Sequence, residues 1–212
     1  RCPIQMEGDG VVFQDIKLVF ESSDALGSVP HREIFLGGYN LTLDNVNTYL
    51  EGAGSEPGGL LGSEKELLPT VYAGGYTGTA VGDHASLTVR NANMKNSDSG
   101  TMFKAIYMGH EGGSDNNTAY KGSAVLNLDA DTIVREGIHT DCNSRAEINI
   151  TGKDGTYQDL ARAKEFYGNE NTTLTLSRAT MENAVADTVG NIVLSDEAYL
   201  SPETGSLNNV TL

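Results

Sequence analysis

The amino-acid sequence contains one short phrase three times. It reads IFLGGY at residues 34–39, VYAGGY at 71–76 and IYMGH at 106–110, so the copies begin 37 and 35 residues apart. Each copy joins an apolar residue to an aromatic one and then turns on glycine. A repeat of this length predicts a stacked solenoid, because a single coil cannot bury its own apolar face and must pack against the next coil.

A short alternating run follows each copy of the phrase, at residues 41–43, 87–89 and 125–128. Alternation of apolar and polar residues is typical of a strand with one buried face, and it leads us to expect Leu87 and Val125 in the core. We expect the phrase copies to pair in parallel and in register within one sheet. Further strands are predicted near residues 132–134, 146–150, 173–176 and 191–194.

One segment departs from the strand pattern. Thr156 and Asp159 match a helix-capping signature, Leu160 and Tyr167 recur at helical spacing, and Gly168 follows as a stop signal. The sequence therefore predicts a short helix near 156–167, packed against the side of the coils.

Charge and hydropathy restrict the partners. The chain has 212 residues, with 14 Lys and Arg against 29 Asp and Glu, for a formal net charge of −15. This charge repels nucleic acid and anionic membrane surfaces, and no apolar run approaches the ~18 residues of a membrane span. We expect no nucleic-acid partner, no membrane insertion and a single domain over 1–212, as a piece of a longer exported protein. The oligomeric state stays open.

Short strands, glycine corners, variable loops and Asn-rich turns such as residues 44–47 make most of residues 8–212 resemble the right-handed parallel β-helix of the pectin-lyase-like class. The resemblance implies an all-β solenoid with long lateral loops. Members of the class include polysaccharide lyases and hydrolases, phage tailspikes and bacterial surface adhesins. A shared fold does not choose among these functions, so the site residues must do so.

The hydrolase signatures of that class are incomplete here. The sequence offers His110-Glu111 after Gly109 and a His139-Thr140-Asp141 run, but it has neither an Asp-Asp pair nor an Arg-Ile-Lys run. A glycoside hydrolase needs two carboxylates flanking one bond, about 5–10 Å apart. Asp141 with Asp115, or Asp141 with Glu111, could meet this requirement across neighbouring coils, and the favoured alternative is that these acids are solvated turn residues.

A lyase mechanism would require Ca²⁺ held by carboxylates and a basic residue as the proton acceptor. Asp129, Asp131 and Asp141 with Arg135 and His139 form the nearest grouping. We expect no bound cofactor otherwise, with Ca²⁺ as the one ion that these acids could hold. The alternative is structural, since aspartates beside strands commonly accept hydrogen bonds from turn backbone.

Aromatic residues give the strongest ligand-binding hypothesis. If the phrases superpose, Phe35, Tyr72 and Tyr107 form one column and Tyr39 and Tyr76 form another, with rings about 4.8 Å apart. An exposed column would offer a platform for a sugar or peptide, whereas an inward column would be ordinary core stacking. Because the chain has no Trp, we favour internal or half-buried stacking over ligand contact.

Our leading hypothesis is a non-catalytic, adhesin-like module of a secreted or cell-surface bacterial protein. It would bind a glycan or a host surface protein through its lateral loops, with Tyr39, Tyr76, His110 and Glu111 as the candidate contacts. The alternative is a polysaccharide-active lyase or hydrolase that uses the grouping around Arg135. An enzyme needs its acids and bases to converge in one groove, while a binding module needs exposed rings or loops.

Overall fold

The structure is a computed structural model that describes residues 4–18, 32–50, 68–75, 82–92, 99–109, 122–152, 158–159, 165–204, 207 and 209–212. All regular secondary structure in these ranges is β-strand. The strands form sheets of eight, six, three and two strands. No helix in the described ranges has the length and apolar character needed to cross a membrane.

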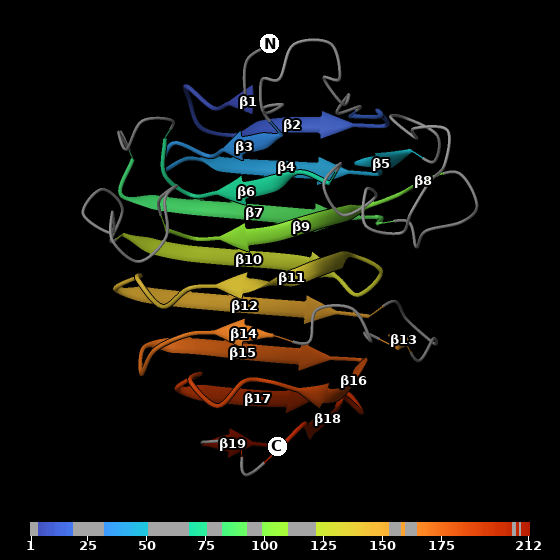
Figure 1. Ribbon diagram of the computed structural model, residues 1–212, viewed down its shortest axis with the longest axis vertical. Helices are drawn as coiled ribbons and strands as arrows, with labels where there is room; N and C mark the ends of the chain where they lie inside the picture. The colour runs from blue at the N-terminus through green and yellow to red at the C-terminus, as the bar shows by residue number, and fades with distance from the viewer. Residues whose placement is uncertain are drawn as a thin grey trace, which may run out of the picture.

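The eight-stranded sheet runs the whole length of the molecule (Figure 1). All of its neighbouring strands pair in parallel, and the apolar–polar alternation of its middle strands buries one of their faces. Its strands, in the order in which they pair, are β2 (Val11–Gln14), β4 (Asn40–Asp44), β7 (His84–Arg90), β10 (Ser123–Asp129), β12 (Arg145–Thr151), β15 (Thr172–Ser177), β17 (Asn191–Ser195) and β19 (Val210–Thr211).

The six-stranded sheet contains the repeated phrase. Ile34 pairs with Val71 and Val71 with Ile106, so the three copies lie in parallel and in register, as the sequence predicted. The strands, in pairing order, are β1 (Ile4–Gln5), β3 (Glu33–Phe35), β6 (Thr70–Tyr72), β9 (Met102–Tyr107), β11 (Ile133–His139) and β14 (Phe166–Tyr167).

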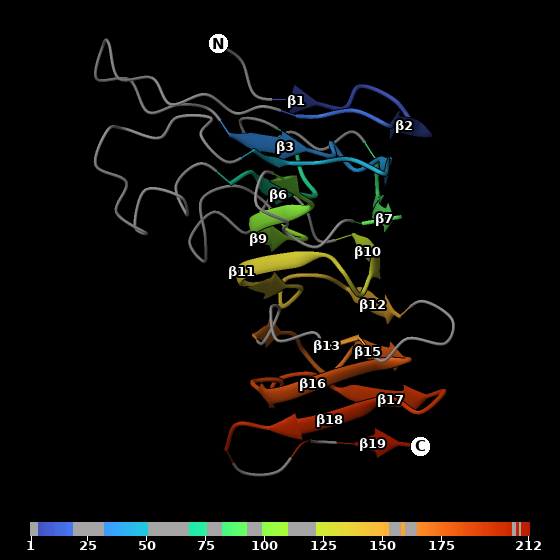
Figure 2. The same ribbon diagram turned by 90° about the vertical axis from the view of Figure 1, so that its right-hand side faces the viewer.

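Up to β15 the chain passes from one of these sheets to the other in turn, so each passage adds one strand to each sheet (Figures 1 and 2). Beyond β15, only the eight-stranded of these two sheets gains further strands. This all-β, parallel arrangement is consistent with the β-helix class. Two small sheets lie beside it: β13 (Gln158–Asp159), β16 (Ala179–Ala184) and β18 (Tyr199–Pro202) pair in parallel, and β5 (Tyr49–Leu50) pairs with β8 (Ser99–Gly100) in antiparallel fashion.

The helix predicted near 156–167 is wrong for the described part of that segment. Residues 158–159 form β13, Glu165 forms a parallel bridge with Val185, and residues 166–167 form β14. The backbone N–H of Phe166 donates to the Val185 carbonyl at 2.8 Å. Pairing with neighbouring coils therefore outweighs the local helical pattern, since propensity is a weak prior against tertiary context. Residues 156–157 and 160–164 lie outside the described residues.

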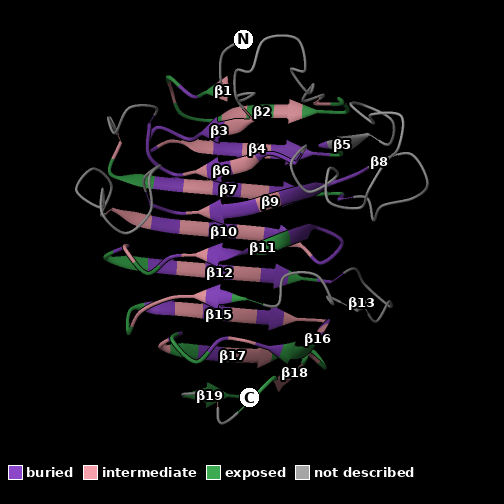
Figure 3. Cartoon of the chain, in the orientation of Figure 1, coloured by how far each residue is buried: buried purple, intermediate pink, exposed green. Residues whose placement is uncertain are grey.

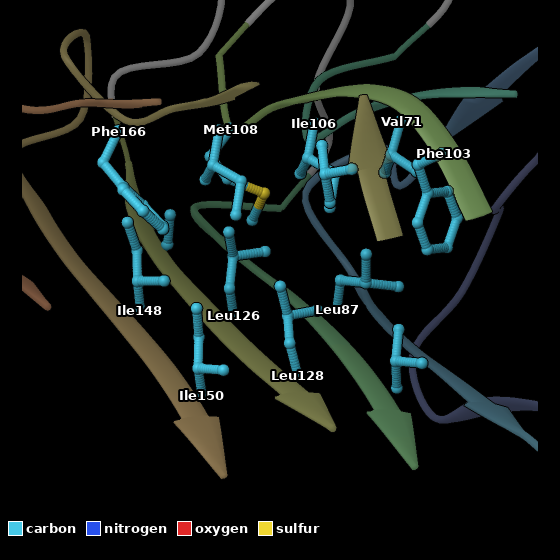
Figure 4. Close-up of a cluster of buried hydrophobic side chains, with 14 of the residues drawn as sticks. Val71, Leu87, Phe103, Ile106, Met108, Leu126, Leu128, Ile148, Ile150 and Phe166 are labelled. Atoms are coloured by element: carbon cyan, nitrogen blue, oxygen red, sulfur yellow. The ribbon is translucent and has the colours of Figure 1, made fainter. Parts of the chain in front are cut away.

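The core lies between the inner faces of the two large sheets, where apolar side chains from β7, β10 and β12 meet those from β6, β9 and β14 (Figure 4). Inward-facing residues at paired positions are of similar type in successive strands, so similar side chains stack on one another. One such row, set by the strand register, is Leu41, Leu87, Leu126, Ile148, Leu174 and Ile192, and every member is buried.

The burial pattern corrects one expectation within the core. Leu87 is fully buried, as predicted, but Val125 is half-buried and faces outward. Its neighbours Ala124 and Leu126 point inward instead, and the alternation of buried and half-buried residues is visible along β10 in Figure 3. The predicted inward-facing position on β10 was wrong by one residue, because a run such as Ala124-Val125-Leu126 is apolar on both faces of the strand.

Turns after the long sheet repeat one backbone conformation. Strands β2, β4, β7, β15 and β17 are each followed directly by a residue in the left-handed region, with φ between 50° and 54°. Asn and Asp tolerate this conformation better than other non-glycine residues, which explains the Asn-rich turns in the sequence. The five residues are Asp15, Asn45, Asn91, Arg178 and Asp196.

Candidate functional site

Five aromatic side chains stack along the outer face of the six-stranded sheet, and we call them the aromatic column: Phe35, Tyr72, Tyr107, His139 and Tyr167. Each is the last residue of its strand, and the strand register places them side by side. Successive ring centroids are 5.4, 5.4, 4.4 and 4.5 Å apart, with interplanar angles of 7° to 18°. The column predicted from the first three residues is therefore present, and it is longer than expected.

The aromatic column lies on the side of the sheet opposite to the core. In every strand the residue before the ring is a buried apolar residue, so the ring itself points outward. Phe35 is fully buried, while the other four rings are half-buried. Because stacked rings cover one another's faces, what remains along the outer side of the column is ring edges, phenol hydroxyls and imidazole nitrogens. The stacking is therefore outward and half-buried.

Carboxylates flank the tyrosines of the column. The Tyr167 hydroxyl donates to Oε2 of Glu165 at 2.9 Å, and this hydrogen bond, together with burial, raises the pKa of Tyr167. Burial and the nearby charge of Glu136 raise the pKa of Tyr107. Both phenols therefore stay protonated and uncharged well above neutral pH. The Tyr107 hydroxyl can donate a hydrogen bond, whereas that of Tyr167 already donates to Glu165.

His139 lies between two tyrosine rings, and the centroid of its imidazole is 4.4 Å from that of Tyr107 and 4.5 Å from that of Tyr167. Burial lowers its pKa and outweighs the opposite effect of the Asp141, Glu165 and Glu136 carboxylates. The imidazole is therefore neutral at neutral pH, with one nitrogen able to donate and the other able to accept. Along its outer edge the column thus presents uncharged hydrogen-bonding groups.

The predicted lyase or hydrolase grouping begins at the end of β10. Asp129 Oδ1 accepts a hydrogen bond from the Asp131 backbone N–H at 3.0 Å, and its Oδ2 accepts one from the Ala92 N–H at 3.3 Å. Asp129 therefore has the turn-stabilising role that was the structural alternative. Asp131 is buried in the same turn, and Arg135 is exposed on β11.

His139 ends β11 and Asp141 follows it, at the opposite end of this strand from those two aspartates. A strand of seven residues spans about 20 Å, so the structure does not bring Asp129 and Asp131 together with His139 and Asp141. Within the described residues, no group of three or more His, Cys, Asp or Glu side chains could hold a metal ion.

Of the predicted ligand contacts, Tyr39 alone belongs to the described residues. It follows β3, is half-buried and packs against the core, and its backbone N–H donates to the Leu36 carbonyl at 3.0 Å. Tyr76, His110 and Glu111 lie outside the described residues. The second aromatic column proposed from the sequence stays a prediction.

Sequence reasoning missed two members of the aromatic column, His139 and Tyr167. A signal for both exists, because an apolar residue directly precedes a ring in Ile138-His139 and Phe166-Tyr167, as in Ile106-Tyr107. Two features conceal it. The register between β9 and β11 shifts between Val134 and Gly137, and Tyr167 ends the segment that has a helical pattern.

The chain was compared with protein-family models, with curated proteins and with solved structures. None of them matches it. Function is therefore inferred from the residues of this chain and from their geometry.

Proposed function

We propose that this chain is a right-handed parallel β-helix of the pectin-lyase-like class, and that it acts as a non-catalytic, adhesin-like binding module of a secreted or cell-surface bacterial protein. Its proposed ligand is a glycan, bound along the aromatic column and by the lateral loops that the sequence predicts. The observation that supports this most is the column itself, a row of hydrogen-bonding ring edges on an outer sheet face.

The β-helix assignment is supported by strand order and pairing. Up to β15 the chain passes in turn between two parallel sheets, and each strand of these sheets pairs with the strand one coil away. Parallel strands joined by a crossover are right-handed in the great majority of proteins, because of the right-handed twist of each strand. That preference is our reason for proposing the right-handed form.

A glycan suits the aromatic column because the hydrogen-bonding groups of the two match in their regular spacing and in their lack of charge. Tyr72, Tyr107, His139 and Tyr167 end adjacent strands, so their polar atoms recur at about one strand spacing along the stack. Glycans are extended polymers with a regular series of hydroxyl groups, each able to donate and to accept. The phenol of Tyr107 and the neutral imidazole of His139 offer the same two capacities without charge, and the Tyr167 oxygen can accept.

Binding along the column is tested by removing polar atoms while keeping the rings. We expect wild-type protein to bind at least one member of a glycan array, and Tyr107→Phe and Tyr72→Phe to weaken that binding about 5- to 30-fold, as for the loss of one or two hydrogen bonds. Thr42→Ala, on the outer face of the other large sheet, is the matched control and should bind as the wild type does.

Two outcomes would overturn the proposal. One is the absence of binding to every glycan on the array. The other is binding that Tyr107→Phe and Tyr72→Phe leave unchanged while Thr42→Ala reduces it, because the ligand would then lie on the eight-stranded sheet. Thermal unfolding of each variant separates a lost contact from a lost fold.

A further inference from the structure

We propose that His139 is a pH-sensitive contact that fastens β14 to β11, so that mild acid loosens the pairing of these two strands. The geometry that carries this proposal is a sandwich in which the imidazole lies between Tyr107 of β9 and Tyr167 of β14. The interplanar angles are 18° and 7°, so both ring faces of His139 are covered.

The pairing that His139 fastens is short. Strands β11 and β14 share two paired positions, Ile138 with Phe166 and His139 with Tyr167. Two backbone hydrogen bonds flank these positions, from the Ile138 N–H to the Glu165 carbonyl at 3.0 Å and from the Thr140 N–H to the Tyr167 carbonyl at 2.7 Å. The Thr140 hydroxyl donates to the same Tyr167 carbonyl at 3.2 Å. A change in one of the two paired side chains therefore acts on a large share of this junction.

Charged and titratable groups face His139 from its own strand and from each of the two strands that pack against it. Burial between the rings opposes a charge on the imidazole, whereas neighbouring carboxylates and the tyrosine faces attract one. The groups are Tyr107 and Lys104 on β9, Glu136 on β11 with Asp141 just beyond it, and Tyr167 on β14 with Glu165 just before it. Nζ of Lys104 lies 3.9 Å from Oε1 of Glu136 and offsets part of that carboxylate's charge.

The direction of the pH effect depends on whether burial or the neighbouring carboxylates have the larger effect on the pKa of His139. Burial is the largest and lowers the pKa of His139 in the folded protein. Above the ordinary pKa of His, about 6.5, the imidazole is neutral in both the folded and the unfolded chain. As the pH falls below that value, the unfolded chain takes up a proton more readily, so the stabilising contribution of the neutral contact is progressively lost.

The experiment compares wild type with His139→Phe, which keeps a ring in the column but cannot titrate. Thermal unfolding and hydrogen exchange at the Ile138 and Thr140 amides, which donate to the Glu165 and Tyr167 carbonyls, are followed from about pH 8 to about pH 5, a window in which His dominates titration. His84→Gln is the matched control, because His84 is exposed beside Asp83 on the other large sheet. His31 and His110 are unchanged in every variant, so their contributions cancel.

Once the slower intrinsic exchange chemistry in acid is divided out, we expect the protection of these two amides to fall in acid at least 3-fold more in wild type and His84→Gln than in His139→Phe. Equal pH responses in wild type and His139→Phe would overturn the proposal. An NMR titration of His139 in the wild type gives a second test that needs no variant. An imidazole that titrates at or above the ordinary value would also overturn it. Neither test depends on the glycan proposal, so the two can fail separately.

Discussion

At the scale of single residues, position within the strand alternation decides which side chains form the core. Val125 and Leu126 are neighbours of similar hydrophobicity on β10, yet Leu126 is fully buried and Val125 faces outward. Leu126 pairs with Leu87 on one side and with Ile148 on the other, which places it in the middle of an inward row. The sequence pattern alone did not separate the two.

This adjacent pair gives a test of the strand register. We expect Leu126→Asp to cost several kcal/mol, because it places an unpaired carboxylate in the core, and this is a large fraction of the stability of a typical domain. Val125→Asp should cost less than about 1 kcal/mol. Urea unfolding of both variants measures the difference. A larger loss for Val125→Asp would mean that the strand faces the other way.

Glycine is required where two coils approach most closely. A Cβ on Gly38 would lie 2.3 Å from the Gly82 carbonyl oxygen, and Gly38 also has a φ of +80°. We expect Gly38→Ala to destabilise the protein by about 2 kcal/mol or more, through left-handed backbone strain and this overlap. Gly8→Ala is the control, since nothing lies within 4 Å of its added Cβ. Chemical denaturation that finds equal losses would contradict the close approach.

At the scale of elements, strands and their pairing could be predicted where the repeat is clear. The glycine corners and the apolar–ring pairs at residues 34–35, 71–72 and 106–107 were enough to predict a parallel, in-register sheet and three stacked rings. Beyond Tyr107 the repeat degenerates. The helical pattern near 156–167 could not show that Phe166 and Tyr167 find strand partners in β11, because those contacts come from a different coil.

The aromatic column should stabilise the sheet on which it lies. Tyr107 stacks on Tyr72 on one side and on His139 on the other, and each aromatic pair contributes about 0.5–1.5 kcal/mol beyond its buried area. We therefore expect Tyr107→Ala to lose at least 1–3 kcal/mol and Tyr107→Phe to stay within about 0.5 kcal/mol of wild type. If calorimetry showed equal losses for the two variants, ring stacking would not be the stabilising contact.

At the scale of the whole molecule, the two candidate functions differ in what the coils must bring together. A polysaccharide-active enzyme requires acids and bases from several coils to converge on one bond. In the structure, β11 separates Asp129 and Asp131 from His139 and Asp141. The aromatic column, by contrast, takes one residue from each of five neighbouring strands of the six-stranded sheet, along one face.

We expect the purified protein to release neither reducing nor unsaturated ends from polygalacturonate or related acidic glycans, with or without Ca²⁺. The scattered positions of Asp129, Arg135 and Asp141 are the physical reason. Activity above background that Asp141→Asn or Arg135→Ala abolishes would replace the binding-module proposal with the lyase or hydrolase alternative.

Successive coils should stack in parallel with a constant spacing, and spin-label distances on the outer face of the eight-stranded sheet measure that spacing. Labels at Thr42 and Thr175, or at Thr88 and Val193, are both separated by four strand steps in the register, or about 19 Å. We predict that these two pairs give equal distances and that Thr42 with Val193 gives one longer by about 5 Å. Unequal distances for the first two pairs, or no increase for the third, would contradict the stack.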